Sequence, residues 1–226
     1  MRAEVKLDGW RAVGAVLEDH RPLLLSREGN DLGPLFPEVL TALAHCAIGT
    51  VVDGELVAWE NERVSFSALA RRRGRDRRKC PPVAFVLFDV LARPATDLRL
   101  RPLSERLAHL EQVVAEAGPP AQQVDATTSR EEALLWYEAL RFAGLEGLVL
   151  KRTESLYVPA RTRWVKVRHS EPSTQRASVC DRTPRPSRQP RRTAARRQDP
   201  THGPTQPCGP GVGRPSSRQP SLSTPF

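Results

Sequence analysis

Near its start the chain reads Glu4-Val5-Lys6-Leu7-Asp8-Gly9-Trp10-Arg11, a stretch with charged residues at every second position from Glu4 to Asp8. Side chains alternate between the two faces of an extended strand, so Glu4, Lys6 and Asp8 are expected to share one face. A lysine between two carboxylates is commonly part of a solvated row of ion pairs. The alternative is a nucleophilic lysine. An amine attacks only when it is unprotonated, and flanking acids alone favour the ammonium form, so this alternative requires further cations or a metal close by.

Charged residues at predicted strand boundaries elsewhere in the chain could supply those groups. Glu55 and Glu146 each adjoin a glycine, which allows close backbone approach. Carboxylate oxygens at such positions suit Mg²⁺ that carries phosphate. Lys166 and Arg168 are expected on one face of a strand, as a phosphate-binding pair would be. Taken singly, each feature has a commoner interpretation: a plain turn for Asp53-Gly54-Glu55 and a solvated strand face for Lys166-Val167-Arg168.

The composition separates a domain-sized body from a basic tail. Residues 1–170 contain 25 Lys and Arg and 23 Asp and Glu, a net charge of +2, whereas residues 171–226 contain 10 Arg and 3 acids, a net charge of +7. The tail also holds 11 of the 21 prolines, so we expect it to be disordered. The body is long enough for one domain with a core, which excludes a large multidomain enzyme. Its two cysteines, Cys46 and Cys80, exclude a disulfide-stapled secreted domain.

Hydrophobic periodicity predicts a mixed α+β domain with several antiparallel strand pairs rather than a doubly wound sheet. Strands are expected over 12–17, 23–25, 50–59, 83–91, 148–150 and 164–167, with a turn or bulge at Asp53-Gly54. Helices are expected over 36–46, 66–73, 103–117 and 129–143, with Ser104 as a candidate N-cap of the third. The N-terminus does not resemble a signal peptide, and no run approaches the roughly 18 apolar residues that span a bilayer, so we expect a cytoplasmic protein that does not enter membranes.

Read in order, the motifs form a series that is more specific than any of its members. The series is Lys6-x-Asp8-Gly9-x-Arg11, Ser26-Arg27-x-Gly29, Asp53-Gly54-Glu55, Phe85-Val86-Leu87-Phe88-Asp89, Glu146-Gly147 with Lys151, and Trp164-Val165-Lys166-Val167-Arg168. It resembles the motifs of covalent nucleotidyltransferases, and most closely those of ATP-dependent DNA ligases of the bacterial kind, over nearly all of residues 1–170. The resemblance implies an ATP-grasp-like adenylation domain with antiparallel sheets flanked by helices.

The resemblance also implies a reaction and its participants. Lys6 would attack the α-phosphate of ATP and form lysyl-AMP, and the enzyme would then seal nicks in duplex DNA during repair, recombination or replication. ATP and Mg²⁺ or Mn²⁺ are the implied cofactors. Nicked duplex DNA is the implied partner of a monomer that is associated with the nucleoid when it is bound to DNA.

Individual roles follow from the same resemblance. Glu4 would help to read adenine, and Phe88 would stack on it. Arg11 would contact the ribose or phosphate region, and Glu55 the ribose. The remaining implied roles are triphosphate neutralisation by Lys151, Lys166 and Arg168, contact with the 5′-phosphate side of a nick by Ser26 and Arg27, and divalent metal binding by Glu146 and Asp8.

The sequence departs from the family pattern in three places. It begins five residues before Lys6, where family members carry a longer leader. Arg168 stands where a second lysine is common, and Ala160 stands where a glycine is common. The family continues into an OB-fold domain, a barrel of about five strands. Residues 171–226 show no strand-like alternation in its place, which suggests a shift of the reading frame near Ser170.

Two other functions are also compatible with the sequence. One is that of a related nucleotidyltransferase, such as an RNA ligase or a capping-type enzyme. The other is that of a degenerate, non-catalytic fragment that binds nucleic acid through its Arg-rich tail. The basic stretch Arg71–Lys79 would suit a DNA backbone, or it is a solvated loop.

Overall fold

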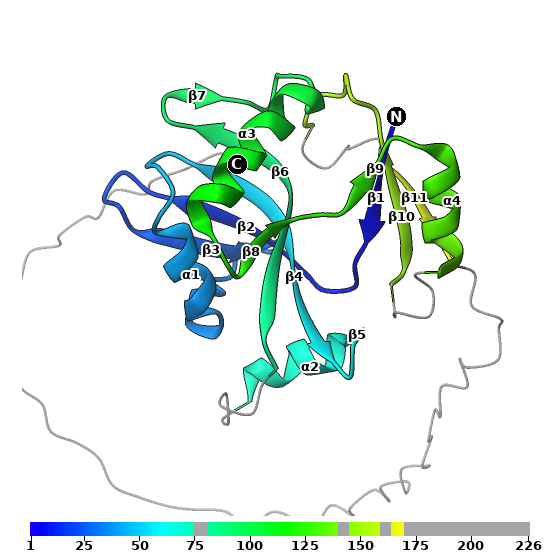
Figure 1. Cartoon of the computed structure of the whole chain (residues 1–226). Helices are drawn as coiled ribbons and strands as arrows, with labels where there is room; N and C mark the ends of the chain where they lie inside the picture. The colour runs from blue at the N-terminus through cyan, green and yellow to red at the C-terminus, as the bar shows by residue number, and fades with distance from the viewer. Residues whose placement is uncertain (75–80, 140–144, 159–163, 170–226) are drawn as a thin grey trace, which may run out of the picture. The chain divides into compact units, whose positions relative to one another are not determined.

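Two mainly antiparallel sheets within the unit Met1–Arg176 organise the fold (Figure 1). The computed structural model describes residues 1–74, 81–139, 145–158 and 164–169. The larger sheet has the strand order β3(Pro22–Ser26), β2(Trp10–Val16), β4(Val51–Glu60), β6(Val83–Arg93), β7(Thr96–Asp97), with β5(Arg63–Val64) paired to β4 and β8(Ala121–Gln123) parallel to β6. The smaller sheet has the order β11(Val165–Arg168), β10(Gly147–Lys151), β1(Arg2–Lys6), β9(Ala126–Thr127). The expected mixed α+β fold is confirmed. The expected tail lies outside the described residues.

The segment around Asp53 continues as a single strand instead of turning. Strand β4 pairs with β6 from Val51 to Ala58, and the register shifts between Val51 and Val52 and again between Asp53 and Gly54. A side chain at Gly54 would lie 2.7 Å from the Phe85 ring and 2.8 Å from the carbonyl oxygen of Val86. Glycine therefore permits the close approach of two neighbouring strands at an irregularity, so of the two predicted alternatives the bulge is correct.

In the described part of the chain, four α-helices and two short 3₁₀ helices cover the sheets (Figure 1). They are η1(Gly33–Leu35), α1(Pro37–Leu43), α2(Phe66–Ala70), η2(Arg71–Arg73), α3(Leu103–Ala117) and α4(Arg130–Ala139). Helix α3 packs on β6 in the main core, and α4 packs on the smaller sheet, where Ala133 joins Ala3 and Leu148 in a separate apolar cluster. Residues 140–143 of the fourth predicted helix lie outside the described residues.

The two longer helices begin in different ways. The Ser129 hydroxyl accepts a hydrogen bond from the Glu132 N–H (3.2 Å), as expected of an N-cap for α4. The prediction that Ser104 caps α3 is wrong, because the helix begins one residue earlier, after Pro102. The N–H groups of Leu103 and Ser104 donate instead to the carbonyls of Ser155 and Thr153, at 3.0 and 2.9 Å. Backbone acceptors thus satisfy the first turn without a capping side chain.

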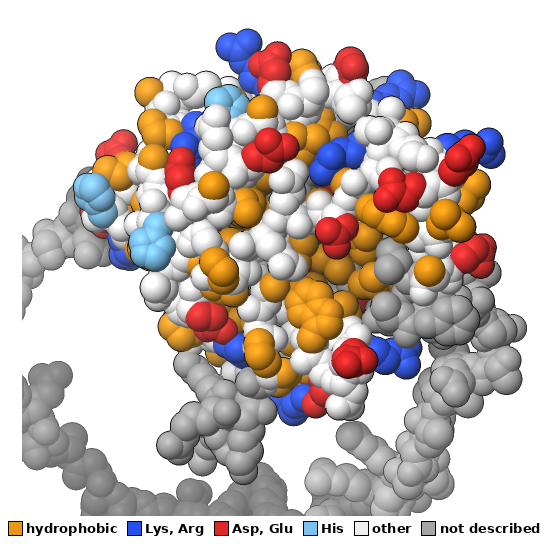
Figure 2. Space-filling model, in the orientation of Figure 1, with side chains coloured by type: hydrophobic (Ala, Val, Ile, Leu, Met, Phe, Trp, Pro, Cys, Tyr) orange, Lys and Arg blue, Asp and Glu red, His pale blue; other side chains and the backbone are white. Residues whose placement is uncertain are grey.

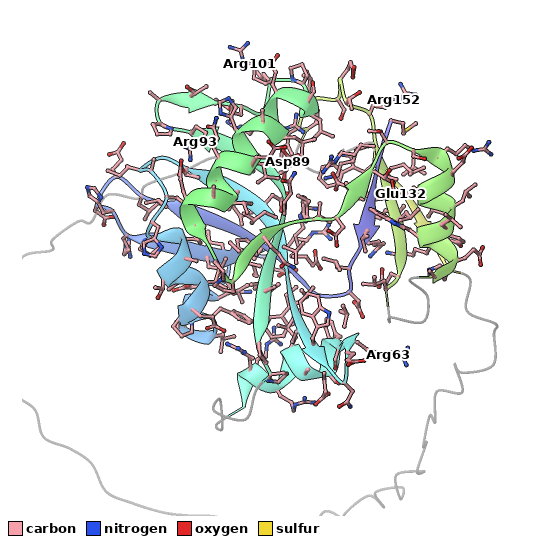
Figure 3. All side chains as sticks on the ribbon, in the orientation of Figure 1. Arg63, Asp89, Arg93, Arg101, Glu132 and Arg152 are labelled. Carbon is pink, nitrogen blue, oxygen red and sulfur yellow. The ribbon has the colours of Figure 1, made fainter. Side chains whose placement is uncertain are left out.

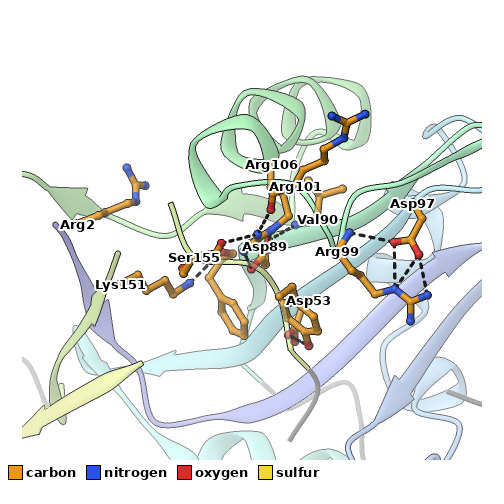
Figure 4. Close-up of polar contacts among 12 residues, drawn as sticks. Arg2, Asp53, Asp89, Val90, Asp97, Arg99, Arg101, Arg106, Lys151 and Ser155 are labelled. Atoms are coloured by element: carbon orange, nitrogen blue, oxygen red, sulfur yellow. Dashed lines mark hydrogen bonds and ion pairs between the residues drawn. The ribbon is translucent and has the colours of Figure 1, made fainter. Parts of the chain in front are cut away.

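A buried ion pair joins α3 to the larger sheet and to the segment that follows β10 (Figure 4). The Arg106 and Asp89 side chains are both 0% exposed. Arg106 donates to both oxygens of Asp89, at 2.7 and 2.9 Å, and to the carbonyls of Arg101 and Ser155, at 2.6 and 2.9 Å. Figure 3 shows Asp89 in the interior beside α3, whereas Arg101 and Arg152 project outward. Ser155, in the segment that follows β10, is thereby attached to the larger sheet.

None of the helices in the described part of the chain is both long and apolar enough to cross a membrane.

Candidate functional site

The register of the smaller sheet gathers the charged motif residues on one face. Directly paired residues of neighbouring antiparallel strands point to the same side. One row across β1, β10 and β11 therefore consists of Lys6, Gly147 and Arg168, and the next consists of Glu4, Val149 and Lys166. The opposite face carries the apolar residues that pack against α4. The charged residues that alternate along each strand therefore lie together on one face of the smaller sheet, as a cross-strand array of Glu4, Lys6, Lys166 and Arg168.

This array forms one wall of a pocket, and strands β2, β4 and β6 contribute the other side. The residues lining it are Glu4, Val5, Lys6, Leu7, Arg11, Glu55, Phe88, Val124, Val149, Lys151, Trp164 and Lys166. Seven of the eight residues predicted to bind ATP are among them, and Arg168 is the exception. Residues about 150 positions apart in the sequence therefore share one pocket.

Lys6 lies at the end of β1 and forms an ion pair with Glu146. Their side chains are 13% and 33% exposed, so the pair is open to solvent on one side. The Glu146 N–H also donates to the Lys6 carbonyl (3.0 Å), which fixes the start of β10 beside Lys6. The next residue, Gly147, has φ +139°, and a side chain there would collide with the carbonyl oxygen of Val167. Glycine therefore permits the close approach of β11 to the start of β10.

Two further carboxylates near Lys6 have raised pKa values. Burial raises the pKa of Glu55 to about 7, although Lys6 and Arg11 act in the opposite direction. Burial, followed by the charge of Glu146, raises the pKa of Asp8, which lies just beyond β1. Both carboxylates therefore lie where additional positive charge would be stabilising.

Asp8 and Glu146, the predicted metal ligands, are close enough to influence each other electrostatically. The described residues contain no group of three or more His, Cys, Asp or Glu positioned to enclose a metal ion. Mg²⁺ commonly binds through one or two carboxylates together with substrate phosphates and water. The donor set fits a metal held in that way, and it does not fit a metal held by the protein alone.

Cations also accumulate around Lys6. Partial burial lowers the pKa of Lys166, and the nearby charges of Lys6, Arg168 and Arg11 lower it further. Arg168 Nε also lies 3.7 Å from Glu146, although its side chain is 63% exposed. The cations that a nucleophilic lysine requires are therefore present in the same array.

Arg11 is held by a carboxylate that was not predicted as a site residue. Asp53, which is 0% exposed, accepts from Arg11 Nε at 3.0 Å and from Nη2 at 2.6 Å. This bidentate contact is the main cause that raises the pKa of Arg11. The sequence contained a signal, since Asp53 belongs to the same Asp53-Gly54-Glu55 motif as Glu55, but it did not reveal that Arg11 is the partner of Asp53.

Glu4 and Lys151 form a second, fully buried ion pair. Lys151 Nζ lies 2.6 Å from Glu4 Oε2 and donates to the Phe88 carbonyl at 3.0 Å, and the two side chains are 2% and 1% exposed. The ammonium also lies 4.0 Å from the Trp164 ring centre and 4.8 Å from that of Phe88. Protein groups thus surround Lys151 at an aromatic wall of the pocket.

Trp164, the first residue of the last motif in the series, lies in the pocket lining. Its ring meets the Phe88 ring edge-on, with centres 5.6 Å apart. The sequence held a signal for this position, because Trp164 shares the two-residue spacing of Lys166 and Arg168.

The predicted DNA-contacting residues are Ser26, which ends β3, and Arg27 in the turn that follows, and neither is part of the pocket lining. The Ser26 hydroxyl accepts hydrogen bonds from the N–H groups of Glu28 and Asn30, at 3.3 and 3.2 Å, which shapes the turn. Arg27 is exposed at its tip. The turn presents a cation to solvent, apart from the array around Lys6.

The described part of the basic stretch Arg71–Lys79 is largely neutralised. Arg71 pairs with Glu60 and Arg72 pairs with Glu38, each at 2.5 Å. Arg73 lies over the Trp10 ring, 4.4 Å from its centre. In the view of Figure 2, Lys and Arg side chains are scattered among Asp and Glu. Residues 75–79 of the stretch lie outside the described residues.

Comparisons with known proteins agree with this geometry. The family model described as the ATP dependent DNA ligase domain matches residues 1–168. DNA ligase C2 of Mycolicibacterium smegmatis is 35% identical over 191 residues, which are 80% of this chain and 51% of that protein. The multifunctional non-homologous end joining protein LigD of Pseudomonas aeruginosa is 34% identical over 170 residues, 73% of this chain and 20% of that protein.

A solved structure of mycobacterial DNA ligase D complexed with ATP and MES matches with a TM-score of 0.62 and 27% identity. The match covers 74% of this chain and 54% of that one. The present chain thus spans about half the length of the first relatives that it matches. Because the family model covers almost the whole described region, and seven of the eight predicted ATP-binding residues line one pocket, the chain belongs to the ATP-dependent DNA ligase family.

Proposed function

We propose that residues 1–170 form the adenylation domain of an ATP-dependent DNA ligase, with Lys6 as the nucleophile. The observation that carries the proposal is the pocket that contains Lys6, Arg11, Glu55 and Lys166 around a single cavity. Nucleotidyl transfer depends mainly on positioning and on charge neutralisation, and this pocket offers both.

In the first step, Lys6 Nζ attacks the α-phosphorus of ATP. A nitrogen–phosphorus bond forms, the bond from the α-phosphorus to the bridging oxygen breaks, and pyrophosphate leaves while the amine loses a proton. Lys166 and Arg11 would offset the negative charge of the phosphates, which is supported by their place in the pocket lining, and Arg168 stands at the edge of the same array. Phe88 supplies an aromatic face for the adenine, with Glu4 and Lys151 at that end of the pocket.

Glu146 and Asp8 would hold Mg²⁺ or Mn²⁺ together with the phosphates, and the ion would supply additional neutralisation of charge. Phosphate oxygens that bind near Lys6 compete with Glu146 for its ammonium group. Because the Lys6–Glu146 pair is partly exposed, we expect this exchange to be inexpensive.

The later steps would transfer AMP from Lys6 to the 5′-phosphate of a nick and then join the strands by attack of the 3′-hydroxyl, with loss of AMP. Ser26 and Arg27 are the candidate contacts to the 5′-phosphate side. Nicked duplex DNA is the proposed substrate, with a role in DNA repair or recombination, and a monomer suffices for the adenylation step.

Incubation of the purified chain with α-labelled ATP tests the proposal. We expect a covalent adduct in the presence of Mg²⁺ or Mn²⁺, its disappearance in Lys6→Ala, and its retention in the control Arg63→Ala, which alters an exposed cation on β5 (Figure 3). Failure of the wild-type chain to form an adduct with either metal, or adduct formation by Lys6→Ala, would disprove the assignment. Comparing ATP with GTP, and nicked DNA with nicked RNA, then identifies the substrates.

A further inference from the structure

Tyr157 completes a three-residue cluster at the edge of the pocket. Arg11 comes from β2, Asp53 from β4 and Tyr157 from the segment that follows β10. The Tyr157 hydroxyl donates to Asp53 Oδ2 at 2.9 Å and accepts from Arg11 Nη2 at 3.2 Å. Tyr157 is 9% exposed and Asp53 is 0% exposed, so water does not compete freely for these bonds. The hydroxyl therefore uses its donor and its acceptor on the two members of one ion pair.

Counting N–H groups shows what the cluster leaves available. A guanidinium has five N–H donors. Arg11 uses one on Nε for Asp53 and two on Nη2, for Asp53 and Tyr157. Its Nη1 makes no hydrogen bond with any residue that the structure describes. Because Arg11 lines the pocket, the two Nη1 donors remain for a ligand with oxygen acceptors.

We propose that Tyr157 is a positioning residue that orients Arg11 toward the ribose or phosphate oxygens of a nucleotide in this pocket. This inference rests on the proposed function of the pocket and extends it to a residue outside the recognised motifs. Without the Tyr157 hydroxyl, the guanidinium of Arg11 keeps its bidentate contact with Asp53. It loses the third hydrogen bond, which holds the second N–H group of Nη2. Burial, with the charge of Asp53, raises the pKa of Tyr157, so the phenol keeps its proton at neutral pH.

The hydroxyl is not needed to hold its own segment. The Tyr157 N–H donates to the Arg99 carbonyl (2.9 Å), and Arg106 holds the Ser155 carbonyl (2.9 Å). The Tyr157 ring also lies 6.3 Å from that of Trp164, a contact that phenylalanine would keep. Tyr157→Phe therefore removes the bonds to Arg11 and Asp53 while it retains the backbone anchors. This separates positioning from folding.

The test is the dissociation constant of ATP, measured by calorimetry on the full chain. Tyr157→Phe should weaken ATP binding about tenfold, equivalent to ~1.4 kcal/mol. In the adenylation assay, KM for ATP should rise by a similar factor while kcat changes less. Tyr137 is the only other tyrosine, and its hydroxyl donates to the Arg168 carbonyl on β11. Tyr137→Phe is thus the matched control, and ATP affinity should stay within about twofold of wild type.

A double-mutant cycle with Arg11→Ala decides whether Tyr157 acts through Arg11. In that background, Tyr157→Phe should have no further effect on ATP affinity. The inference is overturned if Tyr157→Phe binds ATP like wild type, or if it weakens binding equally with and without Arg11. A wild-type chain that binds ATP but forms no adduct contradicts the proposed catalysis. In that case the double-mutant cycle on ATP affinity still tests whether Tyr157 acts through Arg11. A chain that does not bind ATP contradicts both.

Discussion

Replacing Arg106 by methionine should destabilise the protein by about 3–5 kcal/mol. The methionine fills a similar volume but leaves the Asp89 carboxylate in a fully buried position without its cation. It also removes the donors to the carbonyls of Arg101 and Ser155. The cost is large because a stranded charge loses its solvation on folding and gains no compensating partner.

A second arginine in the same view provides a matched control (Figure 4). Arg99 also binds a carboxylate through two nitrogens, with distances of 2.8–3.2 Å to Asp97. Those two side chains are 45% and 51% exposed. Exposed ion pairs contribute about 0–1 kcal/mol because water solvates both partners when the pair is broken. The Arg99–Asp97 and Arg106–Asp89 pairs have similar hydrogen-bond distances but differ in burial. Comparing the stability of Arg99→Met with that of Arg106→Met therefore measures the effect of burial.

Thermal and urea unfolding at pH 7 measure the difference. For a chain of this size, 1 kcal/mol corresponds to roughly 2–4 °C in Tm. Arg106→Met should therefore lower Tm by roughly 6–20 °C, and Arg99→Met by less than about 4 °C. Adding Asp89→Asn to Arg106→Met should recover at least ~1 kcal/mol, since the buried charge is removed. Equal losses in the two single variants, or no recovery in the double variant, would refute the reasoning.

Three further predictions concern the pocket and the core. The pKa of Glu55 is about 7 in the folded state against 4.5 ordinarily, so the contribution of Glu55 to the stability of the protein falls as the pH rises between these values. In Glu55→Gln, Tm measured in EDTA should therefore depend less on pH in this range than Tm of the wild type. Gly147→Ala should lower the free energy of unfolding in urea by more than about 2 kcal/mol, because the added side chain would collide with the Val167 carbonyl. Gly29→Ala should lower it by only ~1 kcal/mol, because Gly29 has a positive φ but no atom within 4 Å of an added side chain. Cys46 is 5% exposed and burial raises its pKa to about 11, so iodoacetamide at pH 8 should label it only after unfolding, as peptide mass spectrometry would show.

Local patterns in the sequence predicted the elements and the faces of the charged motifs, because alternation along a strand is a property of neighbouring residues. Lys6 and Glu4 on one face, and Lys166 with Arg168 on another strand, could be read in this way. Contacts across the chain could not. Tyr157 and Asp53 are 104 positions apart, and no local pattern joins them. Ser104 failed as a cap for the same reason, since its N–H partner, the Thr153 carbonyl, comes from a distant segment.

The two lysine–glutamate pairs of the smaller sheet differ in a way that bears on their roles. Lys151 and Glu4 are 1% and 2% exposed, so separating them would leave the buried ammonium group of Lys151 without an anion, and the pair is in effect fixed. Lys6 and Glu146 are 13% and 33% exposed, so a phosphate oxygen can take the place of Glu146 beside Lys6, and a metal ion the place of Lys6 beside Glu146, at lower cost. A nucleophile must exchange its partners during a reaction, whereas a residue that shapes a binding wall must not. The same ion-pair chemistry therefore favours Lys6 as the reactive lysine and Lys151 as part of the wall beside Phe88 and Trp164.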